Sequence, residues 1–226
     1  MSAPDAGHGA RVVVWFGVDA GADALPAGAS PGLDGRAARH QRSRAAAHRT
    51  ARLLVAHYTG CPPQQQRWSY TPAGRPLVDH PAGLHVSLSH ADAITAAALS
   101  WDSPVGVDVE PVRPLPGLDA LAREMLSDGE RRDLDAAGAA SREALFLRFW
   151  TRKEAVAKAI GTGLAADLRA IVTTADGALV ALPAHCGAVR EWSLADLPAP
   201  SGAVAALALR APAPHIETRV VRSAEP

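Results

Sequence analysis

The segment Val105-Gly-Val-Asp-Val-Glu110 constrains the fold more than any other part of the chain. Its valines alternate with a glycine and two acids, and side chains alternate between two faces along a β-strand. The pattern therefore predicts a short buried strand with the valines on one face and Asp108 and Glu110 together on the other. Two carboxylates that share a face repel each other, so a cation must lie nearby or one of them must take up a proton.

Two interpretations of these acids are open. Mg²⁺ prefers carboxylate oxygens and is usually held by only one or two of them plus substrate phosphates, so the pair indicates a metal site. The simpler alternative is an ordinary edge strand whose acids face water. This segment alone does not decide between them.

Length and charge restrict the class of protein. With 226 residues the chain can form one large domain or two small ones and can bury a real core. Lys plus Arg and Asp plus Glu are both 23, and this balance argues against a general nucleic-acid binder. The sequence shows neither a membrane span nor a signal-peptide pattern. Cys61 and Cys186 are isolated, which indicates no disulfide framework and makes the cytosol the expected compartment.

The first half of the chain predicts strands around a basic helix. Residues 11–18 are dense in β-branched and aromatic residues, and residues 33–58 have helical periodicity and many arginines with few acids beside them. The simple interpretation of these arginines is a solvated face, whereas an unpaired basic helix also suits a polyanionic ligand. The remaining expected elements are a loop over 19–31, a short strand over 64–70 and a hairpin of strands over 85–90 and 94–100.

Two short segments of this half carry candidate binding residues. Residues 71–76 read as a turn that presents Arg75. Ser89 and His90 end the first strand of the hairpin, where they could satisfy local backbone groups or offer a hydroxyl and an imidazole to a phosphate.

The second half predicts helices followed by strands. Ser127 and Glu130 fit a capping box, with serine at the N-cap and glutamate three residues later. The expected helices cover 118–125, 127–134 and 141–160, the last ending at Gly161, and the expected strands after them cover 170–174, 178–182, 189–194, 203–209 and 215–221.

The long helix carries a row of three residues, two of which are functional candidates. Trp150, Glu154 and Lys158 are four residues apart, so they lie on one side of the helix. A surface ion pair between Glu154 and Lys158 would contribute only about 0.5 kcal/mol. Because the same row contains a tryptophan, we expect it to lie against another part of the protein, where a partly buried glutamate needs a partner.

Taken together, these segments resemble the 4′-phosphopantetheinyl transferases. The paired pattern is the Gly106–Glu110 strand followed about forty residues later by Trp150-Thr-Arg-Lys-Glu-Ala-Val-Ala-Lys158. Gly74-Arg75-Pro76, His85–His90 and Ala47–Thr50 are similar to three further motifs of the family, and the resemblance covers about 33–164. Chain length and the basic first half resemble the larger, surfactin-synthetase-activating class.

The resemblance implies a fold and a reaction. The fold is α/β (α+β), with two similar α/β halves related by a pseudo-twofold and a ligand cleft between them; we expect residues 1–103 and 104–226 to form these halves. The reaction is Mg²⁺-dependent transfer of 4′-phosphopantetheine from coenzyme A to a serine of an apo acyl or peptidyl carrier protein, with release of adenosine 3′,5′-bisphosphate. The class implies a monomer. The cysteine usage, the charge balance and the lack of an apolar span predict a cytoplasmic protein that binds neither nucleic acid nor membrane.

The resemblance also implies roles by position. Asp108, Glu110 and Glu154 are the expected Mg²⁺ ligands, and Lys158 is expected to reach the pyrophosphate of coenzyme A. Glu154 is the first candidate for the base that takes the serine proton, so Glu154 and Lys158 are the expected catalytic pair. The expected contacts of the nucleotide part of coenzyme A are Arg49, Thr50, Arg75, Ser89 and His90.

The sequence departs from the family pattern at Arg75. Arg75 stands where a lysine is usual, and an arginine offers phosphate a planar fork in place of a point charge. The carrier is expected to dock near 111–116 and 118–125, with Arg113 and Arg123 as charged contacts. The alternatives are a non-catalytic coenzyme A-binding relative and another Mg²⁺-dependent phosphoryl-transfer enzyme. The resemblance does not distinguish carriers of polyketide, non-ribosomal peptide and fatty-acid synthesis.

Overall fold

The structure is a computed structural model that describes residues 10–18, 33–161 and 167–222, with the backbone alone at 33–36 and 222. The loop expected over 19–31 lies outside these ranges. The first half forms β1 (Arg11–Val18), α1 (Leu33–Thr59), β2 (Arg67–Tyr70), β3 (Pro76–His80), β4 (His85–Ala91) and β5 (Ile94–Ser100).

The second half forms the helices and strands around the acidic segment. The helices are α2 (Leu118–Met125), α3 (Asp128–Ala136) and α4 (Arg142–Ile160). The strands are β6 (Val105–Pro111), β7 (Val172–Thr173), β8 (Leu179–Ala181), β9 (Ser193–Asp196), β10 (Ala203–Leu209) and β11 (His215–Arg222). No helix in the described ranges is both long enough and apolar enough to cross a bilayer.

Two larger sheets organise these strands. One has the order β11-β1-β5-β4 and the other the order β6-β10-β9, while β2-β3 and β7-β8 form separate pairs. Strand β11 pairs in parallel with β1, so a strand from beyond residue 104 completes the sheet of the first half. The division of the chain at residues 103 and 104 and the pseudo-twofold between the halves stay predictions.

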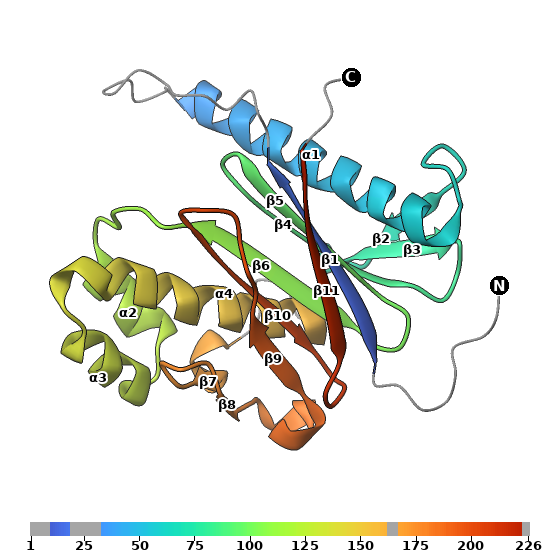
Figure 1. Ribbon diagram of the computed structural model, residues 1–226. Helices are drawn as coiled ribbons and strands as arrows, with labels where there is room; N and C mark the ends of the chain where they lie inside the picture. The colour runs from blue at the N-terminus through green and yellow to red at the C-terminus, as the bar shows by residue number, and fades with distance from the viewer. Residues whose placement is uncertain (1–9, 19–32, 162–166, 223–226) are drawn as a thin grey trace.

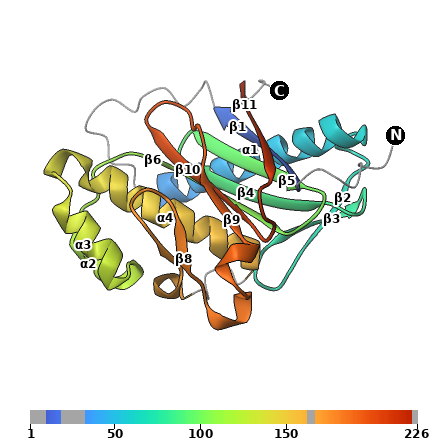
Figure 2. The ribbon, with the colours of Figure 1, turned by 60° about the horizontal axis from the view of Figure 1, so that its bottom comes forward.

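The sheets pack face to face, and each carries a helix on its outer face (Figures 1 and 2). The valines of β6 meet β1 and β5 in one buried cluster that contains Val14, Phe16 and Val107. Helix α1 covers the other face of the first sheet through residues such as Leu54, and α4 covers the other face of the second. The prediction that the β6 valines and the β6 acids face opposite ways is therefore confirmed.

The edges of the two sheets meet where β4 runs beside β6. The Ser87 hydroxyl accepts a hydrogen bond from the Val107 amide at 3.0 Å, and the Ser89 hydroxyl accepts one from the Val109 amide at 3.4 Å. These serines satisfy buried amides that no strand ladder reaches. Side chains thus join the sheets at this edge.

Gly106 brings β6 and α4 into direct backbone contact. A Cβ atom at this position would lie 1.9 Å from the Ala155 carbonyl oxygen and 2.6 Å from the Ala159 amide nitrogen. Only glycine leaves room for so close an approach. The acid-bearing face of β6 is therefore held directly against the C-terminal turns of α4.

A buried ion pair anchors the same helix on its other side. The Lys153 ammonium lies 2.8 Å from the Glu130 carboxylate, and each side chain is only 1% exposed. Glu130 also completes the predicted capping box with Ser127 and accepts the Thr173 amide at 2.9 Å, while Lys153 donates to the carbonyls of Leu168 and Ile171. This network ties α3, α4 and the approach to β7 together.

Three local predictions need correction. The strand expected over 170–174 is shortened to Val172–Thr173, since Leu168–Ala170 is a 3-10 turn whose Leu168 carbonyl accepts a hydrogen bond from Lys153. The strand expected over 189–194 begins only at Ser193, because Val189–Glu191 forms a 3-10 turn in which Glu191 accepts the Ala188 amide. The turn expected over 71–76 is followed by β3, which pairs with β2 and was not predicted.

Candidate functional site

Asp108 is the centre of the candidate site and lies where β6, β4 and α4 meet. Its side chain is 7% exposed. The carboxylate oxygen Oδ1 accepts a hydrogen bond from the Ser89 hydroxyl at 2.7 Å and one from the Lys158 ammonium at 2.7 Å. Within the described ranges, the second oxygen, Oδ2, is buried and has no hydrogen-bond partner. An unpaired buried carboxylate oxygen indicates a missing cationic or donor ligand.

Glu110 and Glu154 lie close enough to Asp108 for its charge to raise the pKa of each of them. Burial raises the pKa of Glu110 to about 7, with the Asp108 charge as the next cause and Arg113 acting against it. Burial and then the Asp108 charge also raise the pKa of Glu154, against the effect of Lys158. Because the Asp108 charge disfavours the ionised forms of Glu110 and Glu154, an added cation would stabilise these carboxylates.

The acids fit a hard divalent cation as donors, although they do not form a closed cage. Across the ranges that the structure describes, no three His, Cys, Asp or Glu side chains are gathered as a ready metal site. Mg²⁺ does not require such a cage, because it keeps several waters and takes substrate phosphates as ligands. The unpaired Oδ2 of Asp108 is the donor atom that fits such an ion.

Lys158 joins the helix to the acidic strand. Its ammonium donates to the Val107 carbonyl at 3.1 Å as well as to Asp108, and the side chain remains 28% exposed. The structure thus pairs Lys158 with Asp108 across two elements, and in the described ranges it forms no ion pair with Glu154. Trp150, from the same row, packs against Phe146. The row therefore lies against other parts of the protein, as the sequence predicted, and Lys158 is its contact with β6.

The side chains of Ser89 and His90 lie on opposite faces of β4. Ser89 faces β6 and Asp108, whereas His90 faces a cavity of about 290 Å³ on the other side of the strand. Arg44 and His48 of α1 line this cavity with Tyr70. Burial lowers the pKa of His90, and the charges of His40 and Lys158 lower it further. His90 is thus a neighbour of both the cavity and Lys158.

The remaining predicted contact residues occupy different places. The Arg75 guanidinium donates to the Ala159 carbonyl at 3.4 Å, and burial lowers its pKa. Thr50 is buried, and its hydroxyl lies 3.2 Å from that of Thr95. Arg49 is exposed and does not line the cavity. The structure therefore brings Ser89 to the acids and His90 to the cavity, but brings neither Arg49 nor Thr50 to either.

Sequence reasoning missed the residues of α1 that do line the cavity. His40, Arg44 and His48 are four residues apart, so they form one row on the helix. The ring of His40 lies 4.8 Å from that of His90, and the ring of His48 lies 5.9 Å from that of Tyr70. The four-residue spacing of these residues could have predicted this row. The row is missed when the arginines of the helix are considered together without their spacing.

The part of the chain that carries the acidic site is similar to a known protein family. Residues 104–208 match the 4′-phosphopantetheinyl transferase superfamily. The matched range contains β6, α4 and all four charged residues of the acidic site. The match thus covers the strand and the helix on which the sequence prediction depends.

Curated relatives agree with this match. The chain is 29% identical to the 4′-phosphopantetheinyl transferase HetI of Nostoc sp. over 75% of this chain and 71% of HetI. It is 30% identical to a putative 4′-phosphopantetheinyl transferase of Synechocystis sp. over 65% of this chain and 61% of that protein. It is 36% identical to the 4′-phosphopantetheinyl transferase AcpT of Salmonella typhimurium over 49% of this chain and 57% of AcpT. These matches show that the chain is similar to proteins named 4′-phosphopantetheinyl transferases, which are enzymes.

Proposed function

We propose that the protein transfers 4′-phosphopantetheine from coenzyme A to a serine of an apo carrier protein, as an enzyme of the surfactin-synthetase-activating class. The observation that carries the proposal is the meeting of Asp108, Glu110, Glu154 and Lys158 inside the matched range. In the reaction the serine oxygen forms a bond to the β-phosphorus of coenzyme A. The bond from that phosphorus to adenosine 3′,5′-bisphosphate breaks.

The charges of the site suit this polyanionic substrate. Lys158 lies next to the acids and holds a positive charge beside the proposed pyrophosphate position. His90 and Arg44 line the neighbouring cavity, which we assign to the nucleotide part of coenzyme A. Phosphoryl transfer depends mainly on positioning and charge stabilisation, and fixed cations provide both.

The acids would hold Mg²⁺ through Asp108 and its neighbours Glu110 and Glu154. The chemistry that a bound Mg²⁺ supplies is neutralisation of charge on the pyrophosphate. Glu154 is our candidate for the group that accepts the proton of the carrier serine on its carboxylate. Burial raises its pKa, and a base with a raised pKa holds a proton more readily near neutral pH.

Intact-mass analysis of an apo carrier domain tests the function. The carrier is incubated with the protein, coenzyme A and Mg²⁺, and parallel samples lack the metal or contain Asp108→Ala. We expect the carrier to gain the mass of one phosphopantetheine in the complete sample alone. Bound coenzyme A without any mass gain across several carriers would favour the non-catalytic alternative. Hydrolysis of coenzyme A without carrier modification would favour another phosphoryl-transfer enzyme.

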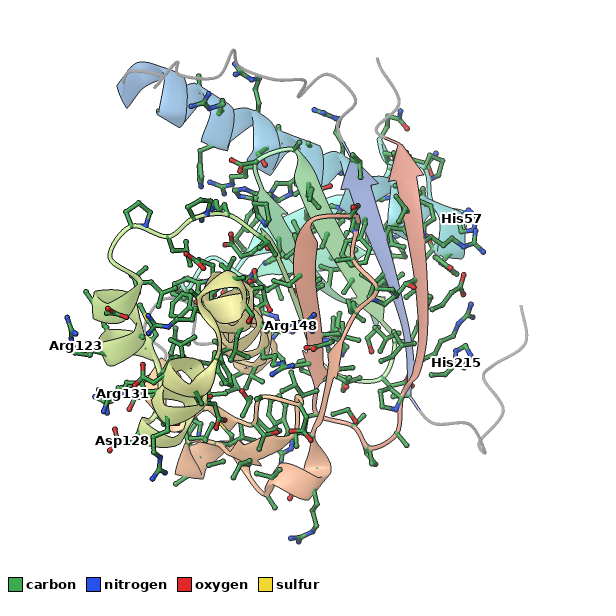
Figure 3. All side chains as sticks on the ribbon, turned by 60° about the vertical axis from the view of Figure 1, so that its left-hand side comes forward. His57, Arg123, Asp128, Arg131, Arg148 and His215 are labelled. Carbon is green, nitrogen blue, oxygen red and sulfur yellow. The ribbon has the colours of Figure 1, made fainter. Side chains whose placement is uncertain are left out.

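Helices α2 and α3 offer the surface where we propose that the carrier docks. Between them lies a cavity of about 840 Å³ with Ala122 and Leu134 among its lining residues. Figure 3 shows Arg123 pointing outward from this side of the molecule. Among the described residues Arg123 and Arg132 line the cavity without a carboxylate partner. An acidic helix is the complement of this surface.

Arg123→Glu is expected to raise the KM for the carrier about tenfold, because one attractive charge becomes repulsive. The KM for coenzyme A should stay unchanged. Arg67→Glu makes the same charge change on an exposed residue of β2 and is the matched control. Arg113 is a poorer test residue, since it lies 3.5 Å from Glu110 and its reversal also disturbs the acids. Equal carrier kinetics for Arg123→Glu and Arg67→Glu would exclude this surface.

A further inference from the structure

Ser87 and Ser89 occupy equivalent places on β4 but differ in one contact. Each hydroxyl accepts a hydrogen bond from an amide of β6, and each side chain is buried. Ser89 alone also donates to a carboxylate, the Oδ1 oxygen of Asp108, at 2.7 Å. The chain therefore contains a natural comparison between a serine that only joins the sheets and one that also holds an acid.

The contacts of Asp108 show what the Ser89 hydroxyl does. The carboxylate of an aspartate can rotate about the Cβ–Cγ bond. Its two oxygens are equivalent until hydrogen-bond donors distinguish them. Ser89 and Lys158 reach Asp108 from two different elements and both donate to Oδ1. This arrangement fixes the carboxylate plane and leaves Oδ2 as the open oxygen.

A serine hydroxyl has one hydrogen to donate. In Ser89 this hydrogen points to Asp108, and the oxygen already accepts the Val109 amide. Ser89 as a residue is 6% exposed, and it does not line the neighbouring cavity, which His90 does. The same hydroxyl therefore has neither a free hydrogen nor an open path to a phosphate in that cavity.

We infer that Ser89 is a positioning residue that orients the Asp108 carboxylate toward the cation, and that it does not contact a phosphate of coenzyme A. The inference rests on the proposed function, because the cation is part of that proposal. It replaces the phosphate contact expected for Ser89 from the sequence. It leaves that expectation in place for His90.

Ser89→Ala and Ser87→Ala test this inference as a matched pair. Each removes a buried hydroxyl that accepts an amide of β6, so both should lower the melting temperature to a similar extent. Only Ser89→Ala removes a donor to Asp108. We expect Ser89→Ala to weaken binding of Mn²⁺, used as a probe for Mg²⁺, about tenfold or more, while Ser87→Ala leaves it unchanged. Mn²⁺ affinity is measured by electron paramagnetic resonance without turnover, and Ser89→Thr should retain most of it.

Kinetics with two substrates separate positioning from phosphate contact. We expect Ser89→Ala to lower kcat with coenzyme A and with dephospho-coenzyme A by the same factor, so that the preference between them is unchanged. Loss of this preference with normal Mn²⁺ binding would overturn the inference in favour of a phosphate contact. Equal Mn²⁺ affinities of the two alanine variants would also overturn it. If the parent protein fails to modify any carrier, the proposed function fails, whereas the Mn²⁺ comparison can still be made.

Discussion

Asp108→Asn is expected to lower the rate of carrier modification on the order of a thousandfold. Asparagine keeps the shape of the side chain and can still accept from Ser89 and Lys158, but it removes the negative charge that opposes Lys158 and would bind the cation. The measurement is the initial rate of phosphopantetheine transfer by mass spectrometry at saturating coenzyme A. Mn²⁺ affinity should fall in parallel.

Folding must be shown to survive this substitution. Asp108→Asn removes an ion pair with Lys158, but it also removes the charge that raises the pKa of Glu110 and Glu154. Because these effects oppose each other, we expect little change in melting temperature. Asp133→Asn is the control, since it removes the same charge from an exposed residue of α3. Transfer by Asp108→Asn at the rate of this control would refute the central role of Asp108.

Lys153→Met is expected to lower the free energy of unfolding by about 3–5 kcal/mol, because it leaves the buried Glu130 carboxylate without a counter-charge. In a chain of this size such a loss corresponds to a fall in melting temperature of roughly 10 °C. The specific activity of the folded fraction, assayed well below the transition, should stay near that of the parent. Thermal unfolding followed by circular dichroism measures the first effect.

The other lysine of the same helix provides a matched comparison. Lys158→Met removes the same charge five residues later, from a side chain that is 28% exposed, and should reduce transfer while costing much less stability. Glu130→Gln combined with Lys153→Met removes both buried charges, so the double variant should lose less stability than the two single losses added together. A stable but inactive Lys153→Met variant would show that Lys153 has a chemical role.

The fold was predictable where local pattern and final structure agree. Alternation along β6 predicted which face carries Asp108, and the spacing of Ser127 and Glu130 predicted the start of α3. Gly161 ends α4 in a left-handed conformation, as its position after the helical pattern indicated. By contrast, β3 is a strand because it pairs with β2, and the sequence of its own five residues does not predict that pairing.

The site was predictable as a set of residues but not as a set of contacts. The resemblance singled out Asp108 and Lys158, which the structure brings within 2.7 Å. It gave no sign that Lys153, also in the helix motif, pairs with Glu130 in the interior. The capping pattern explained Glu130 by its local role, and a local explanation hides a partner that lies far along the chain.

The backbone contact at Gly106 also bears on how the protein can change during evolution or engineering. In most pairs of packed elements, side chains set the separation, so each core substitution shifts it slightly. Here the Gly106 position meets the Ala155 and Ala159 backbone with no side chain between them. Asp108 lies two residues along one element, and Lys158 adjoins Ala159 on the other. Residues that select carriers can therefore be altered elsewhere while peptide geometry keeps this acid and this lysine in register.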